Sequence, residues 1–180
     1  ITESLLKRLE LVVKNAATTI VALTLRAGGA WDVHALVPGR DLVIGGVHIP
    51  HSMGLLGHSD ADVLLHAITD ALLSAAGLGD IGSHFPDTDV RYRAADSAVL
   101  LGHAARQVHE LGWRIANVDA TVVAQAPRLE PHKQAMREAI ARALSMDVVA
   151  INVKAKTAEK LGPAGQRHCI EARAVLLLYK

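Results

Sequence analysis

The feature that most constrains this chain is an apolar stripe at helical spacing between residues 61 and 75. Ser59 or Asp60 is a good N-cap for such a helix, and Asp62 adds a carboxylate to its first turn. Gly77 is a natural residue to end it. We therefore predict a buried helix around which the rest of the chain is arranged. The apolar residues recur every three or four positions, as on one face of an amphipathic helix: Ala61, Leu64, Leu65, Ile68, Ala71, Leu72 and Ala75.

Polar side chains flank this stripe. Asp62, His66 and Asp70 are four positions apart and should stack on one polar face of the helix. His58 lies just ahead of the helix start, where free N–H groups and the helix dipole attract anions. The stretch thus predicts an anion site beside a possible metal ligand, but a solvated helix face with an incidental histidine would give the same pattern.

The composition narrows the class of protein. At 180 residues the chain is one ordinary domain, long enough to bury a core. It is 51% hydrophobic but only 3% aromatic, so the core must consist of Ala, Val, Leu and Ile. A formal net charge of +1 gives no indication of nucleic acid or a membrane surface as partner. The single cysteine rules out an internal disulfide.

The order of elements predicts an α+β fold, with a mixed β-sheet and helices packed on one face. Residues 1–19 are expected to be an N-terminal extension or a linker remnant, and residues 20–180 the domain. The glycine- and proline-punctuated loop over 79–89 is too long for a mere connector and is expected to carry function. We predict strands over 20–26, 31–35, 114–125, 148–155 and 170–179, with a break at Gly28 and Gly29, a hairpin over 42–50, and helices over 95–111 and from 131.

Three residues form a candidate metal site. Asp32 and His34 are two apart on a predicted strand and so share a face, while His66 projects from the helix. One carboxylate and two imidazoles suit a tetrahedral Zn²⁺ with its fourth position open, as in catalytic sites. Spacing alone does not bring the strand and helix together, so three unrelated polar residues remain the alternative.

Other catalytic patterns are weak. Ser59 neighbours His58 and Asp60, but adjacent side chains point apart and no G-x-S-x-G turn is present. The paired glycines match neither a phosphate-binding loop nor a dinucleotide fingerprint.

A series of motifs gives the chain a family resemblance. From about Leu25 to the C-terminus, in unbroken order, the sequence resembles the 2-C-methyl-D-erythritol 2,4-cyclodiphosphate synthase family of the non-mevalonate isoprenoid pathway. The motifs are Asp32-Val-His34, Ile44-Gly-Gly-Val47, Gly54-Leu-Leu-Gly-His-Ser-Asp60, Asp62-Val-Leu-Leu-His66-Ala, Gly79-Asp-Ile-Gly82, Phe85-Pro-Asp-Thr-Asp89, Ala124-Gln-Ala-Pro127 and Lys154-Ala-Lys-Thr157-x-Glu159-Lys.

The resemblance implies a lyase that converts 4-diphosphocytidyl-2-C-methyl-D-erythritol 2-phosphate to the cyclic diphosphate and CMP. It implies one Zn²⁺ per chain, and Mg²⁺ or Mn²⁺ with the substrate. It also implies a homotrimer whose sheets meet around a threefold axis and whose active sites are shared between subunits. The compartment would be the cytoplasm of a bacterium, or the plastid of a plant or alga.

Residue roles follow from the motif matches. Asp32, His34 and His66 would hold zinc, and Glu159 the second divalent ion, while His58 and Thr157 would stabilise the transition state. The phosphates and the methylerythritol end would contact Asp32, His34, His58, Ser59, Asp80, Ile81, Gly82, Phe85, Pro86, Asp87, Thr88 and Asp89. The cytidine side would contact Ala124, Gln125, Ala126, Pro127, Arg128, Leu129, Glu130, Lys156, Thr157 and Glu159.

Departures from the family pattern limit the comparison. Gly28-Gly29-Ala30-Trp31 replaces the usual loop before Asp32. Pro163, Gln166 and Arg167 alter the C-terminal loop, so an axial isoprenoid diphosphate ligand is not carried over. Two alternatives remain: a zinc-dependent phosphoester or nucleotide hydrolase using Asp62 or Asp70 as base, and a non-catalytic trimeric nucleotide-binding protein.

Overall fold

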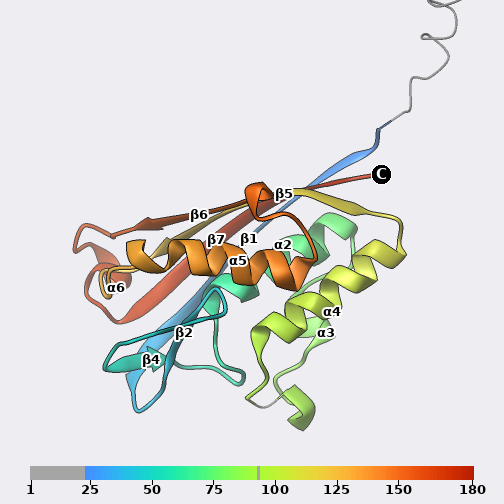
Figure 1. Cartoon of the computed structure of the whole chain (residues 1–180). Coiled ribbons are helices and arrows are strands. Elements are labelled where there is room, and N and C mark those ends of the chain that lie inside the picture. Colours follow the sequence, from blue (N-terminus) through green and yellow to red (C-terminus); the bar gives the residue numbers. More distant parts are fainter. Residues whose placement is uncertain (1–22, 93) are drawn as a thin grey trace, which may run out of the picture.

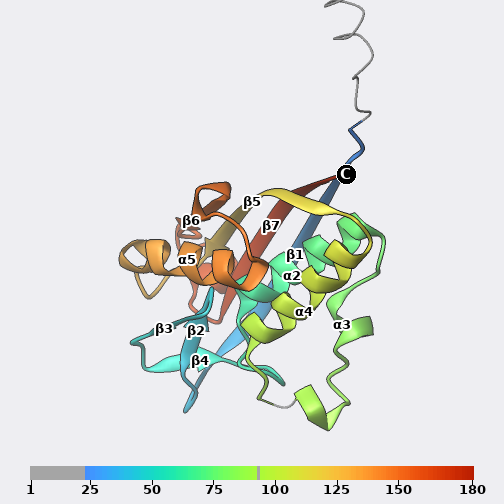
Figure 2. The ribbon, with the colours of Figure 1, turned by 45° about the vertical axis from the view of Figure 1, so that its right-hand side comes forward.

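A five-stranded mixed sheet forms the centre of the protein, with strand order β4-β1-β7-β5-β6. The computed structural model describes residues 23–92 and 94–180 (Figure 1). Strands β5 and β6 pair in parallel, and the other neighbours are antiparallel. Figures 1 and 2 show three helices on one side of this sheet, which confirms the predicted α+β class: α2 (Val63–Ala76), α4 (Ser97–Glu110) and α5 (Lys133–Leu144). The strands of this sheet are β1 (Leu25–Pro38), β4 (Met53–Leu55), β5 (Arg114–Val123), β6 (Ile151–Lys156) and β7 (Cys169–Tyr179).

Helix α2 (Val63–Ala76) is the predicted central helix, but its start differs from the prediction. Asp62, and not Ser59 or Asp60, is the N-cap, and its carboxylate accepts N–H bonds from Leu64 and Leu65. The helix therefore begins at Val63, later than predicted. The Asp62 carboxylate binds N–H groups of the first turn and is not presented on a polar face. Gly77 ends the helix in the left-handed conformation (φ 76°), as predicted.

Strand β1 runs unbroken through Gly28 and Gly29, where a break was predicted. It pairs with β7 from Leu25 to Ala35, and this long ladder keeps the glycines extended. A Cβ on Gly28 would lie 2.0 Å from the carbonyl oxygen of Ala71. The glycine is thus needed for the close approach of α2 to the strand and not for a turn. The predicted 1–19 extension, and the start of the predicted 20–26 strand, lie outside the described residues.

The remaining elements follow the predicted order with shifted ends. The predicted 114–125 strand ends at Val123, and a register shift between Ile115 and Asn117 removes Ala116 from the buried row. The predicted 148–155 strand begins at Ile151, because one 3₁₀ turn (Val148–Ala150) precedes it. Strands β2 (Leu42–Ile44) and β3 (Val47–Ile49) form the predicted hairpin. The other elements are α3 (Ile81–His84), α4 (Ser97–Glu110), α5 (Lys133–Leu144), α6 (Gly162–Gly165) and 3₁₀ turns at Val90–Tyr92 and Glu130–His132.

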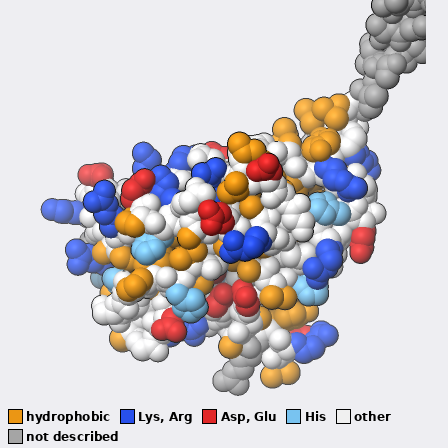
Figure 3. Space-filling view, in the orientation of Figure 1, with side chains coloured by type: hydrophobic (Ala, Val, Ile, Leu, Met, Phe, Trp, Pro, Cys, Tyr) orange, Lys and Arg blue, Asp and Glu red, His pale blue; other side chains and the backbone are white. Residues whose placement is uncertain are grey.

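The two faces of the sheet differ. Between the sheet and α2, the core consists mainly of Ala, Val, Leu and Ile, as the composition predicted. Among the described residues no element covers the other face, which we call the open face. It carries the exposed apolar side chains Trp31, Val33 and Val175. On the helical side, acidic and basic groups are interspersed (Figure 3). No helix in the described parts of the chain is both long and apolar enough to cross a bilayer.

Candidate metal centre and substrate pockets

Asp32, His34 and His66 converge where β1 meets the start of α2. Asp32 and His34 lie opposite the buried residues Ala172 and Ile170 of β7, and this register turns both side chains toward the helical side. His34 Nε2 lies 3.0 Å from His66 Nδ1 and 3.1 Å from Asp32 Oδ2. His66 Nδ1 lies 3.3 Å from the same carboxylate oxygen. The structure thus brings together the three residues that the sequence singled out.

The hydrogen bonds behind the cluster favour a bound cation. His34 Nδ1 lies 2.8 Å from the carbonyl oxygen of Leu56, which can only accept, so Nδ1 carries the proton and Nε2 a lone pair. Asp32 Oδ2 is buried without a hydrogen-bond partner. Tetrahedral zinc with bonds of about 2.0–2.1 Å separates its ligand atoms by about 3.4 Å. The observed spacings are close to that value, so the donor set fits such an ion.

The ionisation of the cluster has a common cause. Burial alone would raise the pKa of Asp32, but the close approach of the His34 and His66 imidazoles lowers it well below the usual range. Burial would lower the pKa of His34, yet its contact with Asp32 raises it. Each pKa shift thus reflects the short distance between the Asp32 carboxylate and the imidazoles beside it.

A cavity of about 440 Å³ opens beside the cluster. It contains the predicted substrate residues His58 and Ser59 and much of the predicted 79–89 loop. Tyr92 and Leu100 also line it, and sequence reasoning missed both. The sequence held only a weak indication of Tyr92, which is one of five aromatic residues in the chain. In the structure its ring packs edge-on against that of Phe85. The lining residues are His34, Gly57, His58, Ser59, His66, Ile81, Gly82, Phe85, Pro86, Asp87, Tyr92 and Leu100.

Four predicted substrate residues, Asp32, Asp80, Thr88 and Asp89, do not line this cavity. Asp80 caps α3 by accepting bonds from the backbone N–H and hydroxyl of Ser83, and these bonds lower its pKa. Asp89 pairs with Arg91, which lowers the pKa of Asp89.

The free N–H groups that the sequence analysis expected at the start of α2 are occupied, because the Asp62 carboxylate accepts those of Leu64 and Leu65. Asp62 is fully buried and also accepts N–H bonds from Gly45 and Gly46 of the hairpin turn. With these bonds it has no access to water. Asp70 accepts a 2.6 Å bond from the backbone N–H of Ile81 and so holds the loop that lines the cavity. Neither carboxylate lines the cavity beside the metal cluster.

A second cavity, of about 400 Å³, contains the predicted cytidine residues. It is lined by Ala124, Gln125, Ala126, Pro127, Arg128, Leu129, Glu130, Ala155, Lys156 and Thr157. Glu159 does not line it, but its carboxylate accepts the hydroxyl proton of Thr157, which does. Lys160 N–H donates to the side-chain oxygen of Gln125 (3.1 Å), which ties this loop to the end of β5. The two cavities share no lining residue.

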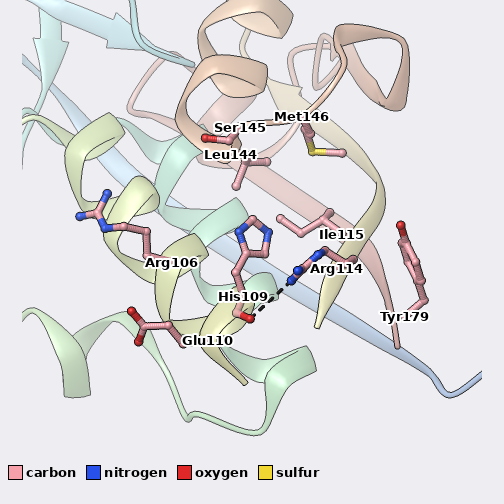
Figure 4. Close-up of a pocket in the computed structure, with 9 residues that line it drawn as sticks. All are labelled: Arg106, His109, Glu110, Arg114, Ile115, Leu144, Ser145, Met146 and Tyr179. Atoms are coloured by element: carbon pink, nitrogen blue, oxygen red, sulfur yellow. Dashed lines mark hydrogen bonds between the residues drawn. The ribbon is translucent and has the colours of Figure 1, made fainter. Parts of the chain in front are cut away.

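A third cavity, of about 570 Å³, lies at the other end of β7, beside Tyr179 (Figure 4). Arg114 Nη1 donates to the carbonyl oxygens of His109 and Trp113, so its charge stabilises the end of α4. Burial and the charge of Arg114 lower the pKa of His109. Arg114 in this third cavity therefore stabilises the end of α4. The predicted site residues that line a cavity lie in the first two.

Comparisons with known proteins agree with this geometry. Residues 25–179 match the model of the YgbB family. The chain is 69% identical over 158 residues to the 2-C-methyl-D-erythritol 2,4-cyclodiphosphate synthase of Verminephrobacter eiseniae, covering 87% of this chain and 86% of that protein. Among solved structures, it is similar to the bifunctional IspDF from Campylobacter jejuni (TM-score 0.85, 44% identity), covering 88% of this chain and 43% of that one. It is also similar to the IspF CDP complex from Plasmodium falciparum (TM-score 0.76, 35% identity), covering 86% and 95% of the two chains.

Proposed function

The chain belongs to the YgbB family, and we infer that it has 2-C-methyl-D-erythritol 2,4-cyclodiphosphate synthase activity in isoprenoid biosynthesis. The observation that carries this inference is the cluster of Asp32, His34 and His66 opening onto a pocket, in a chain 69% identical to a synthase of that name. The substrate is 4-diphosphocytidyl-2-C-methyl-D-erythritol 2-phosphate, and the products are the cyclic diphosphate and CMP.

The reaction is an internal phosphoryl transfer. An oxygen of the substrate's 2-phosphate forms a bond to the β-phosphorus, and the bond from that phosphorus to the oxygen of CMP breaks. CMP leaves with the electron pair. Because a phosphate monoester is mostly dianionic near neutral pH, the step needs no protein base. The barrier is the approach of one anion to another, so positioning and positive charge are what the protein must provide.

We place zinc at Asp32, His34 and His66 and a Mg²⁺ or Mn²⁺ ion at Glu159. Bound divalent ions would neutralise phosphate charge and polarise the attacked phosphoryl group. His58 and Ser59, on the wall of the first cavity, would hold the phosphates. Carboxylate and hydroxyl oxygens like those of Glu159 and Thr157 are ligands that Mg²⁺ accepts.

The two ends of the substrate are assigned to the two cavities. The methylerythritol end would contact Ile81, Gly82 and residues 85–87, with Asp80, Thr88 and Asp89 shaping that loop. The cytidine end would occupy the cavity at residues 124–130 with Lys156 and Thr157. The CDP complex of the related Plasmodium structure supports a cytidine nucleotide as ligand.

We further propose a homotrimer with active sites between subunits. Two observations support it: the cavities for the two ends of one substrate share no residue within a chain, and the open face exposes Trp31, Val33 and Val175. Exposed apolar patches of this kind mark association surfaces. A cyclic trimer would cover the open faces around its axis and bring the zinc side of one chain to the cytidine side of the next. The relative from Verminephrobacter eiseniae is bacterial, so we place the enzyme in the cytoplasm of a bacterium.

Product analysis tests the proposed function. Zinc-loaded protein is incubated with the diphosphocytidyl substrate and Mg²⁺, and the products are followed by ³¹P NMR. We expect CMP and the cyclic diphosphate in equal amounts. A hydrolase would yield CMP and a linear bisphosphate, and a binding protein would yield no CMP; either result would refute the assignment.

A further inference from the structure

Ser97 links the metal ligand His66 to a second carboxylate. It is the first residue of α4 and is only 1% exposed. Its Oγ lies 2.9 Å from His66 Nε2, the nitrogen that faces away from the metal cluster, and 2.5 Å from Asp60 Oδ1. No metal ligand lies on α4, so these contacts connect the cluster to an element that sequence reasoning did not associate with it.

The direction of these hydrogen bonds follows from Asp60. Its carboxylate accepts from the backbone N–H groups of Ser97 (3.0 Å) and Asp62 (3.2 Å), and from the Ser97 hydroxyl. Since the Ser97 proton points to Asp60, the Ser97 oxygen is left to accept the Nε2 proton of His66. His66 Nδ1 then keeps its lone pair and faces Asp32 and His34.

Ser59 has a different role at the same imidazole. Its Oγ lies 3.1 Å from His66 Nε2 and accepts the N–H of Ala61 at 3.1 Å. Among the described contacts no carboxylate takes its proton. Ser59 also lines the first cavity, so its hydroxyl can donate to a ligand there.

We propose that Asp60 and Ser97 are positioning residues that hold His66 in its metal-binding orientation and leave the Ser59 hydroxyl free to donate to a substrate phosphate. This rests on the metal site of the proposed function. Groups behind a metal-bound histidine set its tautomer and ring orientation.

Backbone hydrogen bonds next to Asp60 also reach the wall of the substrate cavity. Asp60 N–H donates to the carbonyl oxygen of Ala95 (3.1 Å), and Ala94 N–H donates to that of His58 (2.9 Å). These bonds anchor the segment that follows the cavity residue Tyr92. These backbone bonds remain when a side chain is changed, so a change at Asp60 or Ser97 acts on His66, while a change at Ser59 acts on the ligand in the cavity.

Zinc affinity of purified, metal-depleted protein tests the proposal, measured by competition with a chromophoric chelator. Ser97→Ala and Asp60→Asn should each weaken zinc binding about 10–100-fold. The double variant should lose little beyond the larger single loss, because Asp60 acts through Ser97. Ser97→Thr, which keeps the hydroxyl, should bind zinc more tightly than Ser97→Ala. Ser59→Ala should leave zinc affinity unchanged and raise KM.

Asp96→Ala is the matched control. Asp96 caps α4 beside Ser97 through Ala98 N–H and does not contact His66, so its loss should lower the melting temperature without changing zinc affinity. Wild-type zinc affinity in Ser97→Ala, or a larger loss in Ser59→Ala than in Ser97→Ala, would overturn the proposal. Asp60→Asn carries the test if Ser97→Ala does not fold. A wild-type protein that binds no zinc would instead refute the metal site itself.

Discussion

His34 Nε2 and His66 Nδ1 lie 3.0 Å apart although 32 positions separate the two residues in the chain. The contact depends on how closely α2 packs on β1, because Gly28 leaves room for the backbone of Ala71. Gly57 has a similar part: a Cβ there would lie 3.2 Å from His34 Cε1 and 2.8 Å from Ala61 Cβ. Glycines on both sides of the cluster thus allow a strand and a helix to share one metal site.

His66→Ala should abolish zinc binding while α2 persists, since alanine is the better helix former. We expect about one zinc per chain in the wild type and none in the variant, measured by elemental analysis of dialysed protein. The control is His103→Ala, an exposed histidine on α4. Stoichiometric zinc in His66→Ala would disprove the ligand assignment.

Glu159→Gln should leave zinc in place and raise the Mg²⁺ or Mn²⁺ concentration needed for half-maximal activity by about tenfold or more, since a charged ligand is lost. Titration of the divalent ion against the rate of CMP release measures this. Glu138→Gln, an exposed change on α5, is the control. An unaltered metal requirement would mean that Glu159 has only a structural role.

Asp70→Ala should raise KM for the diphosphocytidyl substrate without loss of zinc. The change removes the acceptor of the Ile81 N–H and so loosens the loop on the cavity wall. A lost bond to a charged acceptor is worth about 1.5–3 kcal/mol, which predicts an increase of roughly tenfold or more. Asp70→Asn retains an acceptor oxygen and should stay closer to wild type. Equal KM values in all three proteins would exclude this role.

Asp70→Asn should also change the dependence of stability on pH. Burial raises the pKa of Asp70, which outweighs the Ile81 N–H bond, so the folded protein holds this proton more tightly than the unfolded chain. The stability that Asp70 contributes is therefore full in acid and is lost as pH rises through the raised pKa. The melting temperature of the variant relative to wild type, both metal-free, should increase as pH rises. A difference that stays constant with pH would contradict this.

Mixed oligomers test whether sites are shared. His66→Ala and Ala126→Trp, which spoils the cytidine cavity, should each be inactive alone. In randomly mixed trimers an intact zinc half meets an intact cytidine half at about a quarter of the interfaces, so about a quarter of the wild-type activity should return. Adding Trp31→Asp to both chains should prevent this by charging the open face. If every site were complete within one chain, mixing would restore nothing.

The sequence by itself determined the elements whose signal is local. The stripe of α2 and its end at Gly77, the hairpin over 42–50 and the buried row from Val118 to Ala124 were predicted from periodicity and turn chemistry. Each depends only on neighbours within a few positions, because a helix or strand repeats its buried side at a constant spacing. The pairing of Asp32 with His34 on one strand face is of this kind as well.

Tertiary structure decided what depends on contacts between distant segments. Asp62 became the N-cap because the hairpin turn at Gly45 and Gly46 adds two N–H donors to its carboxylate. Gly28 stayed in a strand because β7 pairs with it, and Ser97 came to His66 because α4 packs on α2. The spacing of residues along the chain does not predict these contacts. They follow from burying the apolar face of α2 between the sheet and α4, which brings Asp60 and Ser97 together although they are 37 positions apart.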